Sequence, residues 1–255
     1  MEFCIGGNFK SVVVDDHIPT NSADRPAFCY TNDEEMWAIP LEKAFAKLHG
    51  NYECMQGGKA GMALHLLTGE PNNDFMHGDV SQLNNSNGMG VDGLWKRFIS
   101  GEKRNYVMSA GTGGAGEQDI DGSGIASGHA YTMISAHDVV DANGKPWRLV
   151  KMRNPWGRTE FTGDWKDDDD NHWTPELRSE LGCVEADDGI FFMPLEDYLK
   201  YFDNTSICFD CPDTYKEKRI MHDGRNDAAT VQVLYTFSVS ETVNLDENPV
   251  VFECI

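Results

Sequence analysis

The sequence has no long apolar run and few basic residues. No stretch approaches the roughly 20 consecutive apolar residues that a membrane-spanning helix needs. Residues 1–16 lack the basic region and apolar core of a signal peptide, so none is expected. Lys and Arg number 21 against 42 Asp and Glu, which gives a net charge of −21. We therefore expect no nucleic-acid partner and no membrane surface, whereas the charge is compatible with cation binding.

Cysteines are few and scattered. The seven stand at positions 4, 29, 54, 183, 208, 211 and 254, an odd number without a secretory signal. This usage is typical of reduced thiols, so we predict a cytoplasmic location. Cys208 and Cys211 form one isolated pair, which gives little support for a zinc site because no second pair accompanies it.

What the chain does contain is the composition of an ordinary globular protein, 40% hydrophobic and 11% aromatic. Apolar spacing and end signals predict helices at about residues 32–50, 59–67, 94–99, 174–181 and 195–202. Alternating or short apolar runs predict strands at 9–15, 105–110, 130–136, 147–153 and 189–193. Pro40 should kink the first helix or delay its start. Residues 72–90 and the Gly- and acid-rich residues 111–124 are predicted as loops, the second beside the site.

Residues 128–157 carry the strongest local signal. Two strand-like runs flank Asp-Ala-Asn-Gly at 141–144, and Asn-Gly between such runs predicts a β-hairpin. A hairpin brings its two ends together. His129 precedes the first strand and Asn154 follows the second, so their side chains are expected to face each other across the ladder.

A lone histidine before a strand is usually structural, and the asparagine partner changes this interpretation. A cysteine peptidase of the papain type needs an imidazole that pairs with a thiolate. It also needs a third group that accepts a hydrogen bond from the other ring nitrogen, a role that a neutral amide can fill. Asn154 meets that requirement, and Trp156 next to it can shield the hydrogen bond from water.

The motifs resemble those of calpains. Gly-His-Ala-Tyr at 128–131 and Met-Arg-Asn-Pro-Trp-Gly at 152–157 are similar to the family's His and Asn motifs. Further similar segments lie at 12–19, 41–50 and 188–193, in the family's order, so the likeness covers about residues 5–210. The resemblance implies a papain-like α+β fold, an antiparallel sheet or barrel with flanking helices. It also implies cysteine-type endopeptidase chemistry on protein or peptide substrates, with His129 and Asn154 as catalytic residues and Trp156 packed over them.

The resemblance also indicates what these residues do not include. The calpain nucleophile lies in a Gly-Asp-Cys-Trp type motif upstream of the segment that matches residues 12–19, and the oxyanion-hole glutamine lies in the same part. No cysteine here has that context, and Cys4 stands where the family has an apolar or aromatic strand residue. The isolated chain is therefore expected to be inactive, with the cysteine-bearing lobe supplied in cis or in trans.

The family also implies one calcium ion in this lobe. The matching positions are Glu160, Asp167, the carbonyl of Ala186, and Asp188. The last expected ligand, a glutamate, is replaced by Ile190, which cannot coordinate a hard cation. Glu185 and Asp187 are carboxylates that could compensate, and a solvated acidic loop is the alternative.

The expected organisation is a calpain-type core over residues 1–210. Residues 211–255 are β-rich and occupy the place of the calpain β-sandwich, of which they would be an incomplete start. Two rival functions stay open beside the peptidase. One is a non-catalytic pseudoenzyme that acts as a scaffold, and the other is a calcium-responsive binding module.

Overall fold

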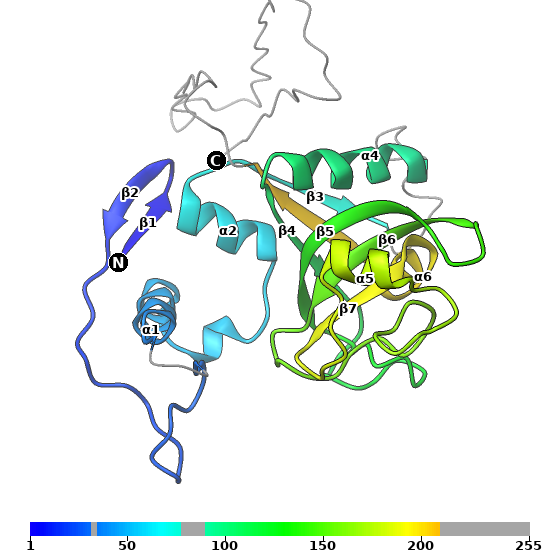
Figure 1. Cartoon of the computed structure of the whole chain (residues 1–255). Coiled ribbons are helices and arrows are strands. Elements are labelled where there is room, and N and C mark those ends of the chain that lie inside the picture. Colours follow the sequence, from blue (N-terminus) through cyan, green and yellow to red (C-terminus); the bar gives the residue numbers. More distant parts are fainter. Residues whose placement is uncertain (32–34, 78–89, 210–255) are drawn as a thin grey trace, which may run out of the picture.

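The largest element of the fold is a six-stranded antiparallel sheet. The computed structural model describes residues 1–31, 35–77 and 90–209. The strand order is β3-β8-β4-β5-β6-β7, and every pairing is antiparallel (Figure 1). The strands are β3 (Asn72–Met76), β4 (Val107–Gly111), β5 (Ala130–Val140), β6 (Pro146–Arg153), β7 (Ile190–Pro194) and β8 (Asn204–Cys208). Together with the helices below, this sheet confirms the predicted α+β class.

Both faces of the sheet are covered near β6 and β7. Alternate side chains of β7 point to opposite faces and enter two different hydrophobic clusters. On one face Phe191 and Met193 join a core with α4 (Gly90–Lys103) and α6 (Leu195–Tyr201). On the other face Phe192 joins Trp165 and Trp173, against which α5 (Pro175–Leu181) packs. The segment between β6 and β7 therefore lies directly on the sheet that carries the predicted site.

The predicted hairpin is confirmed as β5 and β6. Its register runs from Val140 opposite Pro146 to Thr132 opposite Arg153, with an irregularity between Met133 and Ser135. Asp141 closes the turn by accepting hydrogen bonds from the backbone nitrogens of Asn143 and Lys145. The first strand is longer than predicted, because Val139 and Val140 continue the ladder to the turn.

Residues 1–68 form a smaller part that extends from the sheet (Figure 1). It contains β1 (Glu2–Ile5), β2 (Asn8–Ser11), α1 (Ala38–His49), the 3-10 turn η1 (Glu53–Met55) and α2 (Ala60–Thr68). Helix α2 contacts both β1 and the sheet strands β3 and β8, so it joins the two parts. Gly69 ends α2 in a left-handed conformation, φ +75°, as expected for a helix-terminating glycine.

The prediction of a buried strand at 9–15 was wrong beyond Ser11. Residues 12–15 are not in a strand, and Val13 is 76% exposed. The carbonyl oxygens of Val13 and Asp15 instead accept hydrogen bonds from Lys47 and Lys43 of α1. The lysine ammonium groups thus supply the hydrogen bonds that a neighbouring strand was expected to donate.

Helix α1 begins late, at Ala38, which is one of the two outcomes expected from Pro40. The proline then falls in the first turn, where its missing N–H removes no intrahelical bond. Met36 and Trp37, which were predicted on the apolar face, lie before the helix and are 59% and 62% exposed. The buried face is formed by Ile39, Ala44 and Ala46.

Two strands of the six-stranded sheet were missed by the sequence analysis, as was β1 of the smaller part. Residues 72–76 were predicted as part of a loop and form β3, and 204–208 form β8 between β3 and β4. Their many Asn, Asp, Ser and Thr side chains hide the strand signal. In β3 only Phe75 is buried, and the buried residues of β8 include the polar Thr205 and Ser206. The rest of the predicted loop, from residue 78, and the predicted sandwich start at 211–255 lie outside the described residues.

Candidate active site

His129 is held by its backbone just before β5 begins. The backbone nitrogen of His129 donates to Oγ1 of Thr112, 2.9 Å away. The His129 carbonyl oxygen in turn accepts from the Thr112 backbone nitrogen at 3.0 Å. The side chain of His129 is 8% exposed. The imidazole thus occupies one position at the end of the sheet, set by a threonine that the sequence analysis had not singled out.

Asn154 directly follows β6 and is fully buried. Its Oδ1 lies 3.1 Å from Nε2 of His129 and accepts a second hydrogen bond from the backbone nitrogen of Trp156. Its Nδ2 donates to the carbonyl oxygen of Thr159. These two backbone contacts fix which end of the amide is oxygen, so Nε2 of His129 must be the donor of the shared hydrogen bond. The predicted contact between the two side chains is confirmed.

Two aromatic rings hold the imidazole. Trp156 lies with its ring centroid 4.5 Å from that of His129, at an interplanar angle of 39°. Tyr131, two residues along β5, packs edge-on at 4.9 Å and 86°. The Tyr131 hydroxyl accepts from the backbone nitrogen of Ala126. The two rings pack against the imidazole and limit its rotation, and Trp156 lies beside it as the resemblance implied.

A carboxylate that the sequence analysis missed contacts the other ring nitrogen. Oε1 of Glu117 lies 3.1 Å from Nδ1 of His129. Glu117 belongs to the Gly-rich loop that was predicted to lie beside the site. Only the path of that loop brings the side chain to the ring, so no local pattern in the sequence identifies it.

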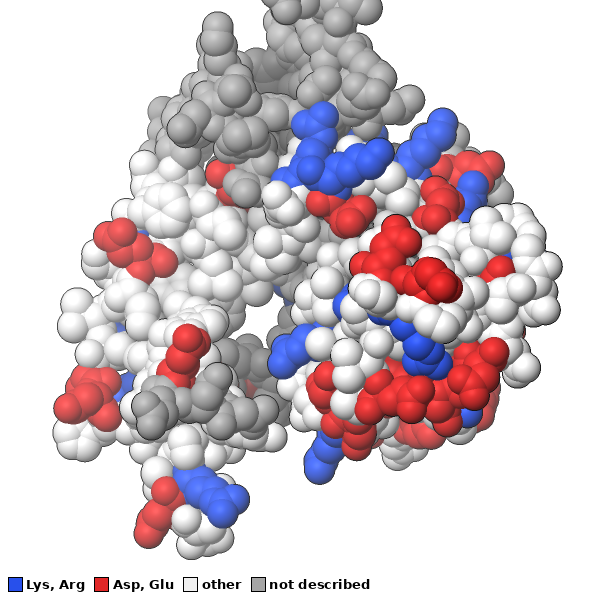
Figure 2. All heavy atoms as spheres, viewed as in Figure 1, with Lys and Arg blue, Asp and Glu red and all other residues white. Residues whose placement is uncertain are grey.

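The residues proposed for calcium line an open acidic pocket. Glu160, Asp167 and Ala186 are among the residues around a volume of about 380 Å³. In Figure 2, acidic side chains gather on the lower part of the sheet-bearing half of the molecule. The structure therefore brings together three of the four positions that were predicted from the sequence.

The fourth position, Asp188, contacts the pocket residue Glu160 through its backbone nitrogen. Oε1 of Glu160 accepts hydrogen bonds from the backbone nitrogens of Asp188 and Gly189, at 2.9 and 2.8 Å. Oδ1 of Asp188 accepts from the backbone nitrogen of Ile190. Ile190 itself begins β7 and offers no side-chain oxygen. In the described residues, the proposed ligands do not form a group whose oxygens all lie within 4.8 Å of one another.

Two carboxyl groups of the pocket have raised pKa values. Burial raises the pKa of Glu160, and the charges of Asp167 and Asp188 add to the rise. Burial likewise raises the pKa of Asp167, with a further contribution from Asp188. Oδ2 of Asp167 is buried without a hydrogen-bond partner. A buried acceptor without a donor fits a cation, so this donor set is suited to calcium although one expected ligand is missing.

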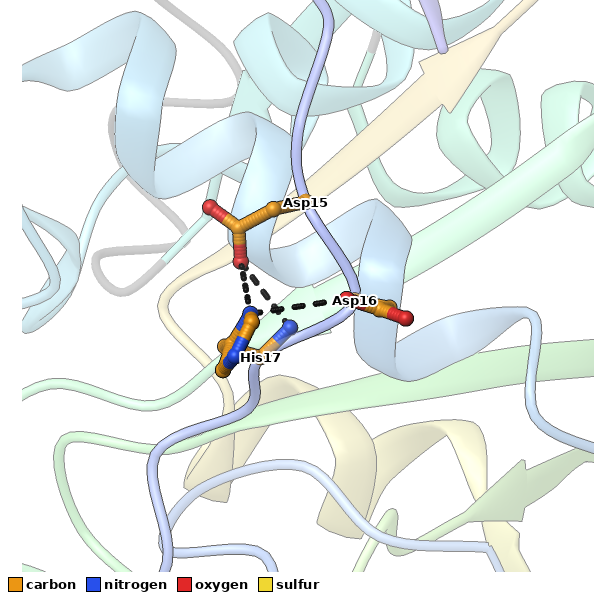
Figure 3. Close-up of side chains that lie close together, drawn as sticks. All are labelled: Asp15, Asp16 and His17. Atoms are coloured by element: carbon orange, nitrogen blue, oxygen red, sulfur yellow. Dashed lines mark hydrogen bonds and ion pairs between the residues drawn. The ribbon is translucent and has the colours of Figure 1, made fainter.

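Two other groups of acidic and histidine side chains have structural explanations. Asp15, Asp16 and His17 are exposed and lie together in Figure 3. Lys43 pairs with Asp15, and this contact lowers the pKa of Asp15 to about 2. In a second group, also containing Asp164, Asp169 accepts from the backbone nitrogen of Trp165 and contacts His172 at 2.6 Å. Both groups fix loops.

Comparison with known proteins shows the family of the chain. The family model described as "Calpain family cysteine protease" matches residues 1–209. The chain therefore belongs to the calpain family of cysteine proteases. It is 34% identical over 212 residues to the calpain-type cysteine protease ADL1 of Oryza sativa subsp. japonica, which is 82% of this chain and 9% of that protein. It is 33% identical over 225 residues to calpain-9 of Mus musculus, 86% of this chain and 31% of that protein.

The chain thus spans less than a third of the length of these relatives. The family resemblance of residues 5–210 is confirmed by the matched range. Among the described residues, no helix is both long enough and apolar enough to cross a bilayer.

Proposed function

We propose that this chain supplies the imidazole and its orienting amide to a calpain-like cysteine endopeptidase. The observation that carries the proposal is the hydrogen bond between Nε2 of His129 and Oδ1 of Asn154, with Trp156 over the ring. The substrates would be proteins or peptides, and the location cytoplasmic.

The geometry suits thiolate chemistry. With Nε2 committed to Asn154, Nδ1 is the nitrogen that would take the proton of a cysteine thiol. The thiolate would then attack the scissile carbonyl carbon, and the imidazolium would return its proton to the leaving amine. Water would release the acyl group in the second half of the reaction. Because Asn154 is neutral, it orients the ring without taking its proton.

The nucleophile would come from outside the residues described. Among these, no cysteine contacts His129, whose ring nitrogens meet Glu117 and Asn154. Burial, followed by the charge of Asp167, raises the pKa of Cys183 to about 11, which is opposite to the requirement of a nucleophilic thiolate. We therefore propose that this chain by itself does not turn over substrate, and that a cysteine-bearing lobe acts with it in cis or in trans.

The test is peptidase activity in the longest natural polypeptide that contains this chain. His129→Ala should abolish cleavage of a denatured protein substrate, whereas Glu176→Ala, an exposed change on α5, should leave it intact. Cleavage by the His129→Ala variant would refute the catalytic assignment.

A scaffold without catalysis is the second candidate. It is supported by the same contact that closes Nδ1 of His129, since Glu117 stands where a nucleophile would approach. If the natural polypeptide has no peptidase activity and gains none with any cysteine-bearing partner chain, the scaffold function is favoured.

Calcium binding is proposed at the acidic pocket, through Glu160, Asp167, the Ala186 carbonyl and Asp188. The buried Oδ2 of Asp167 supports this assignment. The ion would neutralise the carboxylates and tie the segment after Asn154 to the turn before β7. Isothermal titration of the chain with CaCl₂ should show binding that Asp188→Ala weakens, and the absence of heat would remove the proposal.

A further inference from the structure

The imidazole of His129 lies between two acceptors. The orientation of the Asn154 amide is fixed by Trp156 and Thr159, so Nε2 donates to Asn154. On the opposite side of the ring, Nδ1 meets the carboxylate of Glu117. Both acceptors are satisfied when both ring nitrogens carry protons, which is also the charged form that a thiolate–imidazolium pair requires.

Nδ1 is the edge at which the ring remains open to another group. Trp156 and Tyr131 pack on the ring, and Asn154 closes the Nε2 edge. The Glu117 side chain is 56% exposed while that of His129 is 8% exposed. The carboxylate thus reaches in from the solvent side and covers the approach that the nucleophile needs.

The loop that carries Glu117 is held at both ends, because the backbone nitrogen of Gly128 also donates to the carbonyl oxygen of Gly113. Ser127 Oγ donates to the carbonyl oxygen of Gly116, and the backbone nitrogen of Ser127 donates to Gln118. Before Glu117, residues 113, 114 and 116 are glycines, and Gly116 has φ +79°. A small change of backbone angles at Gly114 and Gly116 would move the carboxylate off the ring while the backbone hydrogen bonds at Gly113 and Gln118 stay.

We propose that Glu117 is an occluding residue that must leave Nδ1 of His129 before a cysteine thiolate can pair with the imidazole. This inference rests on the proposed peptidase function and adds a self-inhibiting contact to it. The Glu117 carboxylate and a cysteine thiolate cannot both accept the single proton at Nδ1. Two anions placed at the same ring nitrogen also repel each other. In the resting site the Glu117 carboxylate occupies the Nδ1 edge of the imidazole, and activation requires the Glu117 loop to move.

The contact can be tested in this chain without any nucleophile. Diethyl pyrocarbonate acylates an imidazole nitrogen that has an accessible lone pair, and peptide mass mapping gives the rate at His129. Glu117→Ala should raise this rate about tenfold, the change expected when one charge-assisted hydrogen bond is lost. Glu117→Asp, one methylene too short to reach the ring, should behave like alanine although it keeps the charge. Glu176→Ala, an exposed charge deletion elsewhere, should match the parent chain.

Equal rates in the parent chain and both Glu117 variants would overturn the inference and leave the peptidase proposal unaffected. In the longest natural polypeptide that contains the chain, Glu117→Ala should raise kcat/KM for a peptide substrate. A tenfold fall would overturn the inference, because Glu117 would then assist catalysis. Turnover that survives His129→Ala would instead refute the proposed function, whatever the acylation rates are.

Discussion

The backbone nitrogen of Asn154 donates a 2.7 Å hydrogen bond to the carbonyl oxygen of Gly189. Gly189 has φ +82°, and a Cβ built on it would lie 2.8 Å from the Asn154 carbonyl oxygen and 2.9 Å from the Arg158 nitrogen. The turn before β7 therefore presses directly on the segment that carries the amide partner of His129. The position of Asn154 therefore depends on Gly189, which lies 35 positions later and has no side chain.

Gly189→Ala should disturb both stability and the site. Gly144 in the hairpin turn offers a matched control, because its φ is +83° and nothing lies within 4 Å of its Cβ position. Gly144→Ala should lower the free energy of unfolding by the backbone term alone, about 1–2 kcal/mol. Gly189→Ala should cost several kcal/mol because the contacts with Asn154 and Arg158 add to that term. Urea unfolding of the two variants measures the difference, and equal losses would contradict the close approach.

Asn154→Ala removes three hydrogen bonds at once. It leaves the Trp156 N–H and the Thr159 carbonyl without their partner, and each such group costs about 1–3 kcal/mol when buried. In the natural polypeptide, kcat/KM should fall by about 10²-fold or more, because the imidazole is no longer held in register. Asn143→Ala, which removes one exposed hydrogen bond in the hairpin turn, is the control. Unchanged kcat/KM for Asn154→Ala would argue against its orienting role.

The hairpin could be predicted because its information is local. An Asn-Gly turn and two alternating strands lie within 30 residues, and they alone bring His129 to Asn154. Strands β3 and β8 could not be found in this way. They are polar, and Phe75 pairs with Thr205 across 130 residues of chain. Nothing near either residue specifies that pairing.

Glu117 shows the same limit within the site. Its contact with His129 depends on the backbone path through Gly113, Gly114 and Gly116. Glycines permit many paths, so the sequence indicates a flexible loop but not its course. The proposed calcium ligands are an intermediate case. The family motifs identified the pocket, and the structure adds the buried Oδ2 of Asp167 and the backbone bonds that Glu160 makes.

Asp167→Asn should stabilise the chain in metal-free buffer near neutral pH. Burial and the charge of Asp188 raise the pKa of Asp167, so the folded chain binds its proton more tightly than the unfolded chain. The ionised carboxylate therefore lowers stability at neutral pH, and this loss fades as the pH falls toward the ordinary value of 3.8. Thermal unfolding should show the gain at pH 7 and not at pH values below 3.8.

The Asp167→Asn variant also tests the proposed calcium binding. The parent chain should gain thermal stability with CaCl₂, and Asp167→Asn should lose that gain. Asp170→Asn, whose side chain is 98% exposed, should respond to calcium as the parent does. A full calcium response in Asp167→Asn would show that the ion binds elsewhere.

His77 should make the chain sensitive to mild acid. It is fully buried, its Nε2 contacts Oγ1 of Thr205, and burial lowers the pKa of His77 to about 4. The unfolded chain takes up this proton near 6.5 and the folded chain only near 4, so stability falls as pH drops through that window. The loss should reach about 3 kcal/mol. His77→Gln should flatten this part of the pH profile in urea unfolding, and an unchanged slope would assign the effect to other groups.

Strand β8 is the last strand of the described chain, yet it lies between β3 and β4. During synthesis, before β8 is made, β4 has one unpaired edge and β3 has no partner among the described strands. Those edges can pair with other chains until Cys208 has left the ribosome. The sheet that carries His129 is therefore completed by its most C-terminal strand. A polypeptide cut short before Asn204 would leave β3 unpaired and one edge of β4 open, although it would already hold every residue of the histidine–asparagine site.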